Sequence, residues 1–75
     1  MPVWVFYEED GCEVKIFATP CAAYSYAKEY LKACFSDRPE VIPEAIECLN
    51  EGYKEDMDNF CICDMFFVQK QEIEG

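Results

Sequence analysis

Six carboxylates recur along one segment of this chain at the spacing of a helix. Successive members are four, three, four, four and three residues apart. On a helix of about 3.6 residues per turn, these steps return to one face. A row of carboxylates can bind a basic protein surface, and here only Lys54 lies near the row to neutralise it. These residues, which we call the acidic stripe, are Glu40, Glu44, Glu47, Glu51, Glu55 and Asp58.

The opposite side of the same segment is apolar, as a helix docked on a core requires. It carries Ile42, Ala45, Ile46, Leu49 and Tyr53. Like charges four residues apart destabilise a helix by roughly 0.2–0.5 kcal/mol per pair. The stripe therefore has two interpretations: a binding surface whose function outweighs the repulsion, or a solvated outer face that tolerates it.

Other chemistry finds little support in the residue types present. The chain contains no histidine, which removes the commonest general base and metal ligand. The acidic run 8–10 does not match a calcium-binding loop, and the pair Cys61 and Cys63 lacks the second cysteine pair of a structural zinc site. No glycine-rich phosphate loop is present, and the six basic residues are scattered singly. We expect no enzyme activity, no cofactor, no metal and no direct binding of nucleic acid.

The six cysteines suggest two alternatives. In a secreted mini-protein they would form a three-disulfide framework. Here the chain shows no export signal, and its 52% of hydrophobic residues can support a core without disulfides. Several cysteines also stand where a small hydrophobic residue would serve, including Cys34 in an apolar helical stripe and Cys61 and Cys63 in a strand. We therefore expect reduced, mostly buried thiols.

Composition places the chain among small, acidic, folded proteins. Its 75 residues suffice for one domain, 1–75, and aromatic residues make up 16%. Sixteen acids against six bases give a net charge of −10, which repels nucleic acid and anionic membranes and attracts basic partners. No apolar run reaches the ~18 residues of a membrane span. A cytoplasmic protein without membrane contact is expected.

The N-terminal part predicts a β-hairpin, with strands over 2–8 and 12–17 around Glu9-Asp10-Gly11. A two-residue loop would pair Tyr7 with Val14 and Val5 with Ile16. A three-residue loop with left-handed Gly11 would pair Phe6 with Val14 and Trp4 with Ile16. We prefer the second register because it gathers the bulkiest side chains on one face.

The rest of the chain predicts two helices and one strand. Thr19-Pro20 is a helix start, and apolar residues at helical spacing continue to about residue 35. The second helix begins between Glu40 and Pro43, since proline is tolerated only in the first turn. The apolar stretch 60–69 predicts a third strand, and 70–75 a polar tail. The expected fold is α+β, in the order β-β-α-α-β, with two helices on one face of a three-stranded sheet.

Such a sheet leaves one apolar face without cover from the helices. That face would hold about half of the apolar residues Val3, Val5, Tyr7, Phe17, Phe60, Ile62 and Phe66. An exposed apolar face of this size usually marks an interface. Dimerisation or partner binding through it is one expectation, and cover by strand twist and the C-terminal tail is the other.

Two functions follow, and a third ranks behind them. The first is a small acidic inhibitor or adaptor that engages the basic, nucleic-acid-binding surface of a partner protein through the acidic stripe. Residues of such a stripe lie about 5–6 Å apart, close to the spacing of phosphates in nucleic acid. In size and charge the chain resembles small acidic inhibitors of nucleases from phages and mobile elements, although it shares no motif with them. The second is a structural homodimer joined through the open sheet face, and the third a cysteine-ligated metal or redox protein.

Overall fold

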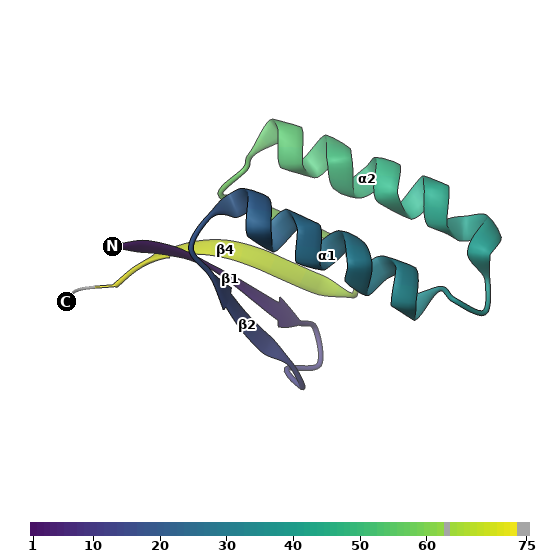
Figure 1. The fold of residues 1–75 in the computed structure, drawn as a ribbon, viewed down its shortest axis with the longest axis horizontal. Coiled ribbons are helices and arrows are strands. Elements are labelled where there is room, and N and C mark those ends of the chain that lie inside the picture. The colour runs from purple at the N-terminus through teal and green to yellow at the C-terminus, as the bar shows by residue number, and fades with distance from the viewer. Residues whose placement is uncertain (63, 74–75) are drawn as a thin grey trace.

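The computed structural model describes residues 1–62 and 64–73, which form two helices packed on one face of an antiparallel sheet (Figure 1). The α+β class and the placement of both helices on one side of the sheet are as predicted. In chain order the elements are β1 (Pro2–Glu8), β2 (Val14–Phe17), α1 (Pro20–Cys34), a short 3-10 helix (Pro39–Val41), α2 (Ile42–Glu55), β3 (Asn59–Ile62) and β4 (Phe66–Glu72).

The sheet has four strands in the order β2-β1-β4-β3, so the prediction of three strands was wrong. The apolar run 60–69 is a hairpin rather than one strand. Asp64 adopts a left-handed backbone with φ of 66°, and the Met65 N–H donates to the Ile62 carbonyl at 3.1 Å. Aspartate tolerates this conformation better than most residues, so a single polar residue suffices to reverse the chain.

The second strand of that hairpin is long and lies beside the N-terminal strand. β4 pairs with β1 from Glu8 opposite Phe66 to Pro2 opposite Glu72. Part of the stretch 70–75 that was expected as a tail is therefore strand, and residues 74–75 lie outside the described part of the chain. This pairing places the start of β1 beside the end of β4. There the amino group of Met1 donates to the Ile73 carbonyl at 3.0 Å.

The register of the first hairpin is the one we did not prefer. Val5 pairs with Ile16 and Tyr7 with Val14, and Gly11 has φ of +75° within the turn. The same register pairs Trp4 with Phe17. The preferred register paired Trp4 with Ile16 in order to place bulky side chains opposite each other. In the structure Trp4 is instead opposite Phe17, whose side chain is larger than that of Ile16. Sequence alternation alone allowed both choices.

Helix α1 begins and packs as its sequence predicts. The Thr19 hydroxyl accepts a hydrogen bond from the Ala22 N–H at 3.1 Å, and Pro20 occupies the first turn. Ala23, Ala27 and Leu31 are fully buried. The small side chains of Ala23 and Ala27 let the helix lie close to β1 and β2, which α1 contacts directly.

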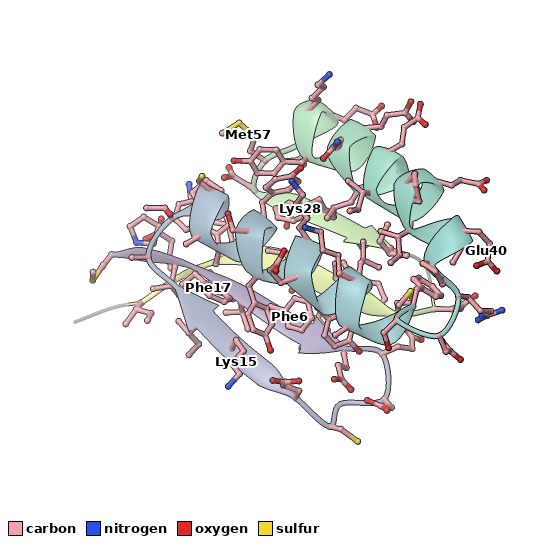
Figure 2. All side chains as sticks on the ribbon, turned by 45° about the vertical axis from the view of Figure 1, so that its right-hand side comes forward. Phe6, Lys15, Phe17, Lys28, Glu40 and Met57 are labelled. Atoms are coloured by element: carbon pink, nitrogen blue, oxygen red, sulfur yellow. The ribbon has the colours of Figure 1, made fainter. Side chains whose placement is uncertain are left out.

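The core lies between the helices and the sheet and is centred on Phe6. Its ring lies 4.9 Å from those of Tyr26 and Phe66 and 5.1 Å from that of Tyr30, measured between centroids. Figure 2 shows Phe6 on the side of the sheet that α1 covers. Leu49 is the fully buried contribution of α2, and Phe66 and Val68 are those of β4. These side chains fix both helices relative to the sheet.

Four cysteines of the described residues are exposed rather than buried, which corrects the expectation for them. Four thiols are free and exposed, and Cys61 is half-buried. Cys34 was expected in the buried stripe of the first helix, but it is the last residue of α1, lies beyond Leu31, the last buried residue of that helix, and is exposed. Cys63 lies outside the described residues. The exposed thiols are those of Cys12, Cys21, Cys34 and Cys48.

Candidate functional site

The central part of the acidic stripe lies on the outer side of α2. Glu44, Glu47, Glu51 and Glu55 all belong to this helix and are exposed. Figure 2 shows carboxylate oxygens along the side of α2 that faces away from the sheet. The described part of the chain forms four salt bridges, and none of them includes a glutamate of α2. These four carboxylates are therefore available to a partner.

The ends of the acidic stripe lie outside the helix, so the expectation of six acids on one helix was wrong. Glu40 belongs to the 3-10 helix that precedes α2 and is exposed, as Figure 2 shows. Helix α2 ends at Glu55, and Asp58 lies three residues beyond that end. Pro43 confines the start of α2, and the chain must leave the helix early enough to enter β3.

Asp58 is used within the fold. Its Oδ1 accepts a hydrogen bond from Nε1 of Trp4 at 3.2 Å, and its Oδ2 lies 3.9 Å from Nζ of Lys70. The Lys70 N–H also donates to the Asp58 carbonyl at 2.8 Å, and the Lys70 ammonium lies 5.8 Å from the Trp4 ring centroid. Asp58 thus satisfies the buried indole and joins the turn before β3 to β1 and β4, instead of extending the stripe.

Contacts between aromatic rings hold α2 against α1. The rings of Tyr24 and Tyr53 stack with centroids 4.5 Å apart, and the Tyr24 hydroxyl donates to the side-chain carbonyl of Asn50. Tyr53 also meets Phe60 edge to face at 5.2 Å. Burial raises the pKa of the Tyr53 hydroxyl. This packing keeps the inner side of α2 fixed, and the glutamates of the outer side are therefore presented on a rigid element.

An apolar groove runs beside the start of α2. It encloses about 330 Å³. Its lining includes one positively charged residue, Arg38, and one negatively charged residue, Glu44. The Arg38 guanidinium lies 5.7 Å from the Phe35 ring centroid. Sequence reasoning missed this groove because its walls come from four separate segments. The apolar lining consists of Phe35, Val41, Ala45, Cys48 and Ile62.

A second acidic cluster occupies the tip of the first hairpin. Ligand atoms of Glu8, Asp10 and Cys12 lie within 4.8 Å of one another. The Cys12 N–H donates to Oδ1 of Asp10 at 3.1 Å, and this hydrogen bond lowers the pKa of Asp10. A side-chain hydrogen bond with Asp10 raises the pKa of Glu8, and the negative charge of Asp10 raises that of the Cys12 thiol. The cluster shapes the turn, as the sequence suggested for this run.

The sheet face away from the helices carries no charged residue, and seven of its ten residues are apolar or aromatic. We call it the open face, and alternation along the strands assigns its residues. Of the residues expected there, Val3, Val5 and Tyr7 belong to it, where Val3 is buried among its neighbours and Val5 and Tyr7 are half-buried, whereas Phe60 and Phe66 lie in the core on the helix side. Phe17 and Ile62 pack against that core. The open face comprises Val3, Val5, Tyr7, Val14, Ile16, Asn59, Cys61, Phe67, Gln69 and Gln71.

Comparison of this chain with protein-family models, with curated proteins and with solved structures found no match. Neither helix of the described residues is long and apolar enough to cross a membrane. Function must therefore be inferred from the surfaces themselves.

Proposed function

We propose that this protein is a non-enzymatic binding module that engages a basic surface of another protein through α2. The observation that carries the proposal is the set of four exposed glutamates on that helix, none of which forms a salt bridge among the described residues. Long-range attraction between the net charge of −10 and a basic partner would speed their encounter. Contacts with the row of carboxylates would then orient the complex.

The spacing of the row favours partners that bind nucleic acid. Adjacent stripe residues on a helix lie about 5–6 Å apart, and charges follow one another along one DNA strand about every 3.4 Å of rise. A groove lined with Lys and Arg for phosphates could therefore accept several α2 carboxylates at once. Occupation of that groove would exclude nucleic acid, so we propose that the module acts as an inhibitor of its partner.

The apolar groove adds a second requirement for the partner. Glu44 belongs both to the row and to the groove wall, so a ligand on the row also reaches the groove. A volume of about 330 Å³ could hold one apolar side chain together with part of its neighbours. The preferred ligand is therefore a basic segment that also presents an apolar residue, such as Leu or Phe.

Synthetic peptides test this proposal. One peptide alternates Lys with Leu, a second alternates Lys with Ser, and fluorescence anisotropy measures their affinity for the full chain at low and physiological salt. We expect the Leu peptide to bind more tightly and both affinities to fall as salt rises, because exposed charges are screened over about 8 Å at physiological ionic strength. Equal affinity of the two peptides would remove the groove from the proposal.

A charge-matched pair of variants separates the stripe from net charge. The stripe variant replaces Glu44, Glu47, Glu51 and Glu55 by Gln. The control variant removes four exposed charges elsewhere, with the substitutions Glu9→Gln, Glu29→Gln, Asp37→Asn and Glu72→Gln. We expect at least a tenfold loss of peptide affinity in the stripe variant and about a twofold loss in the control. Equal losses would show that only net charge matters.

The stripe variant should also be slightly more stable than the natural chain. It relieves the repulsion of Glu47 with Glu51 and of Glu51 with Glu55, each worth roughly 0.2–0.5 kcal/mol. Urea unfolding should therefore give a free energy of unfolding up to about 1 kcal/mol higher. A less stable variant would mean that these carboxylates serve the fold, and its loss of binding would no longer support the proposal.

A further inference from the structure

The open face lacks the charged residues that usually cover the solvent-facing side of a sheet with helices on one side only. In such antiparallel sheets, strand residues facing solvent are mostly polar. Here none of the ten open-face residues is charged, although charged residues make up 29% of the chain. All four charged residues of the described strands lie on the helix side, because each pairs with a residue of that side. They are Glu8, Lys15, Lys70 and Glu72.

The centre of the open face is aromatic and its margins are apolar or amide. The rings of Tyr7 and Phe67 stack with centroids 5.4 Å apart on the two central strands. Val14 and Ile16, on edge strand β2, are 57% and 63% exposed. Depletion of Lys, Glu and Asp, which the open face shares, is a feature of protein interfaces. The surface is therefore suited to burial against another protein surface.

We propose that the open face is a self-association surface, through which two copies of this chain form a face-to-face dimer. A charged partner surface would lose its hydration here without gaining an ion pair, since the open face offers no charge. A second copy presents the same uncharged, mostly apolar face, and its amide side chains can form hydrogen bonds with those of the first copy. The proposal is independent of the binding function of α2, which lies on the opposite side of the sheet.

Electrostatics also favours this arrangement for two copies that each carry a charge of −10. Both helices lie on one face of the sheet (Figure 1), and sheets packed face to face lie about 10 Å apart, so the helices of the two copies would lie on the outer sides of the dimer. The glutamates of the two α2 helices would then be roughly 30 Å apart, with one helix layer and one sheet on each side. That separation is several times the Debye length of about 8 Å at physiological salt. Association through the helices would instead bring the glutamates together.

The size of the open face sets the expected strength of the dimer. Four strands about 4.8 Å apart, each contributing about five residues at about 3.3 Å, cover about 300 Å² in projection. Two such faces would bury roughly 600–1,000 Å² of accessible surface in total, which is below the ~1,200 Å² of stable interfaces and in the range of weak, transient ones. We therefore expect a reversible dimer with a dissociation constant on the order of ten to a hundred micromolar.

Sedimentation velocity of the full chain, from about 1 to about 500 μM, tests the proposal around this expected range. The informative variant is Ile16→Lys, because Ile16 is 63% exposed and its replacement leaves the core intact. The matched control is Met57→Lys, which places the same charge at an apolar residue that is 49% exposed and lies outside the sheet. The near-ultraviolet circular dichroism of Trp4 and the tyrosines verifies that both variants are folded.

We expect the natural chain to pass from monomer to dimer across this range and Ile16→Lys to raise the dissociation constant at least tenfold. Met57→Lys should dimerise as the natural chain does. Amide chemical shifts should change with concentration along β1, β2 and β4 and not along α2. A natural chain that remains monomeric, an Ile16→Lys variant that dimerises like Met57→Lys, or shifts confined to α2 would each overturn the proposal.

Discussion

A hydrogen bond between side chains joins the first hairpin to α1. The Tyr26 hydroxyl donates to Oε1 of Glu13 at 2.6 Å, and both side chains are half-buried. This hydrogen bond, together with partial burial, raises the pKa of Tyr26 to about 12. The folded state therefore favours the neutral phenol more strongly than the unfolded state does, and this preference makes stability depend on pH.

The direction of that dependence follows from the raised pKa. The stabilisation is fully present below about pH 10, the pKa of an unfolded tyrosine, and is lost as pH rises toward about 12. Tyr26→Phe should lower the free energy of unfolding by about 1 kcal/mol near neutral pH, and this difference should shrink across the alkaline range. Urea unfolding of both proteins at a series of pH values measures it. A difference that stays constant with pH would contradict the prediction.

Glu13→Gln provides a control for the cause of the raised pKa. It retains an oxygen that accepts the hydrogen bond and removes the negative charge that opposes ionisation of Tyr26. Absorbance of the tyrosinate should then appear at lower pH than in the natural chain. Burial of Tyr30 and Tyr53 also raises their pKa values, so only the difference between variants reports on Tyr26.

At the scale of elements, local signals decide where α1 begins. Thr19 has extended backbone dihedrals of −139° and 154°, and its hydroxyl caps the Ala22 N–H. Helix α2 lacks such a cap, since Val41 precedes it and the 3-10 helix supplies its entry instead. The two helices therefore differ in how their N-termini are stabilised, although both carry proline in the first turn.

Substitution at the cap of α1 tests this assignment. Thr19→Ala should lower the free energy of unfolding by about 1 kcal/mol, because the Ala22 N–H loses its acceptor. Thr19→Ser keeps the hydroxyl and should stay within about 0.5 kcal/mol of the natural chain. Urea unfolding followed by circular dichroism measures both. If the two variants lost equal stability, the methyl group of Thr19 rather than its hydroxyl would be the important part.

At the scale of the whole molecule, the two sides of the sheet differ in charge. The helix side carries the exposed glutamates of α2 and all the charged residues of the described strands, whereas the open face carries no charge. Such asymmetry allows one side to bind a basic partner while the other binds an uncharged surface. It also means that the repulsion within the monomer is concentrated among the helices and turns.

Salt should therefore stabilise the monomer. Sixteen acids face only six bases, and screening of their mutual repulsion favours the compact state. Urea unfolding of the Ile16→Lys variant, in which we expect little dimer, should show a higher midpoint at about 0.5 M than at about 0.05 M sodium chloride. The same change in salt should weaken peptide binding to α2. A midpoint that falls with salt would show that attractive ion pairs dominate the fold.

The sequence by itself determined those features that depend on neighbouring residues. Thr19-Pro20 and the spacing of Ala23, Ala27 and Leu31 predicted α1 and its buried side. Proline in the first turn confined the start of α2, and the helical spacing of its glutamates predicted their exposed side. These signals act within one or two turns of helix, so no knowledge of the rest of the chain was needed.

The tertiary structure alone decided the features that join distant segments. The turn at Asp64 divides one apolar run into two strands. The pairing of β4 with β1 places Lys70 within the sheet, opposite Trp4. Asp58 lies outside the stripe because α2 ends at Glu55, and its carboxylate accepts the Trp4 indole N–H. The apolar groove forms where four segments meet. Alternation along a strand is compatible with two registers, and each register places a given side chain on a different face of the sheet. Long-range packing selects between them, so the residues of the open face could be assigned only from the assembled sheet.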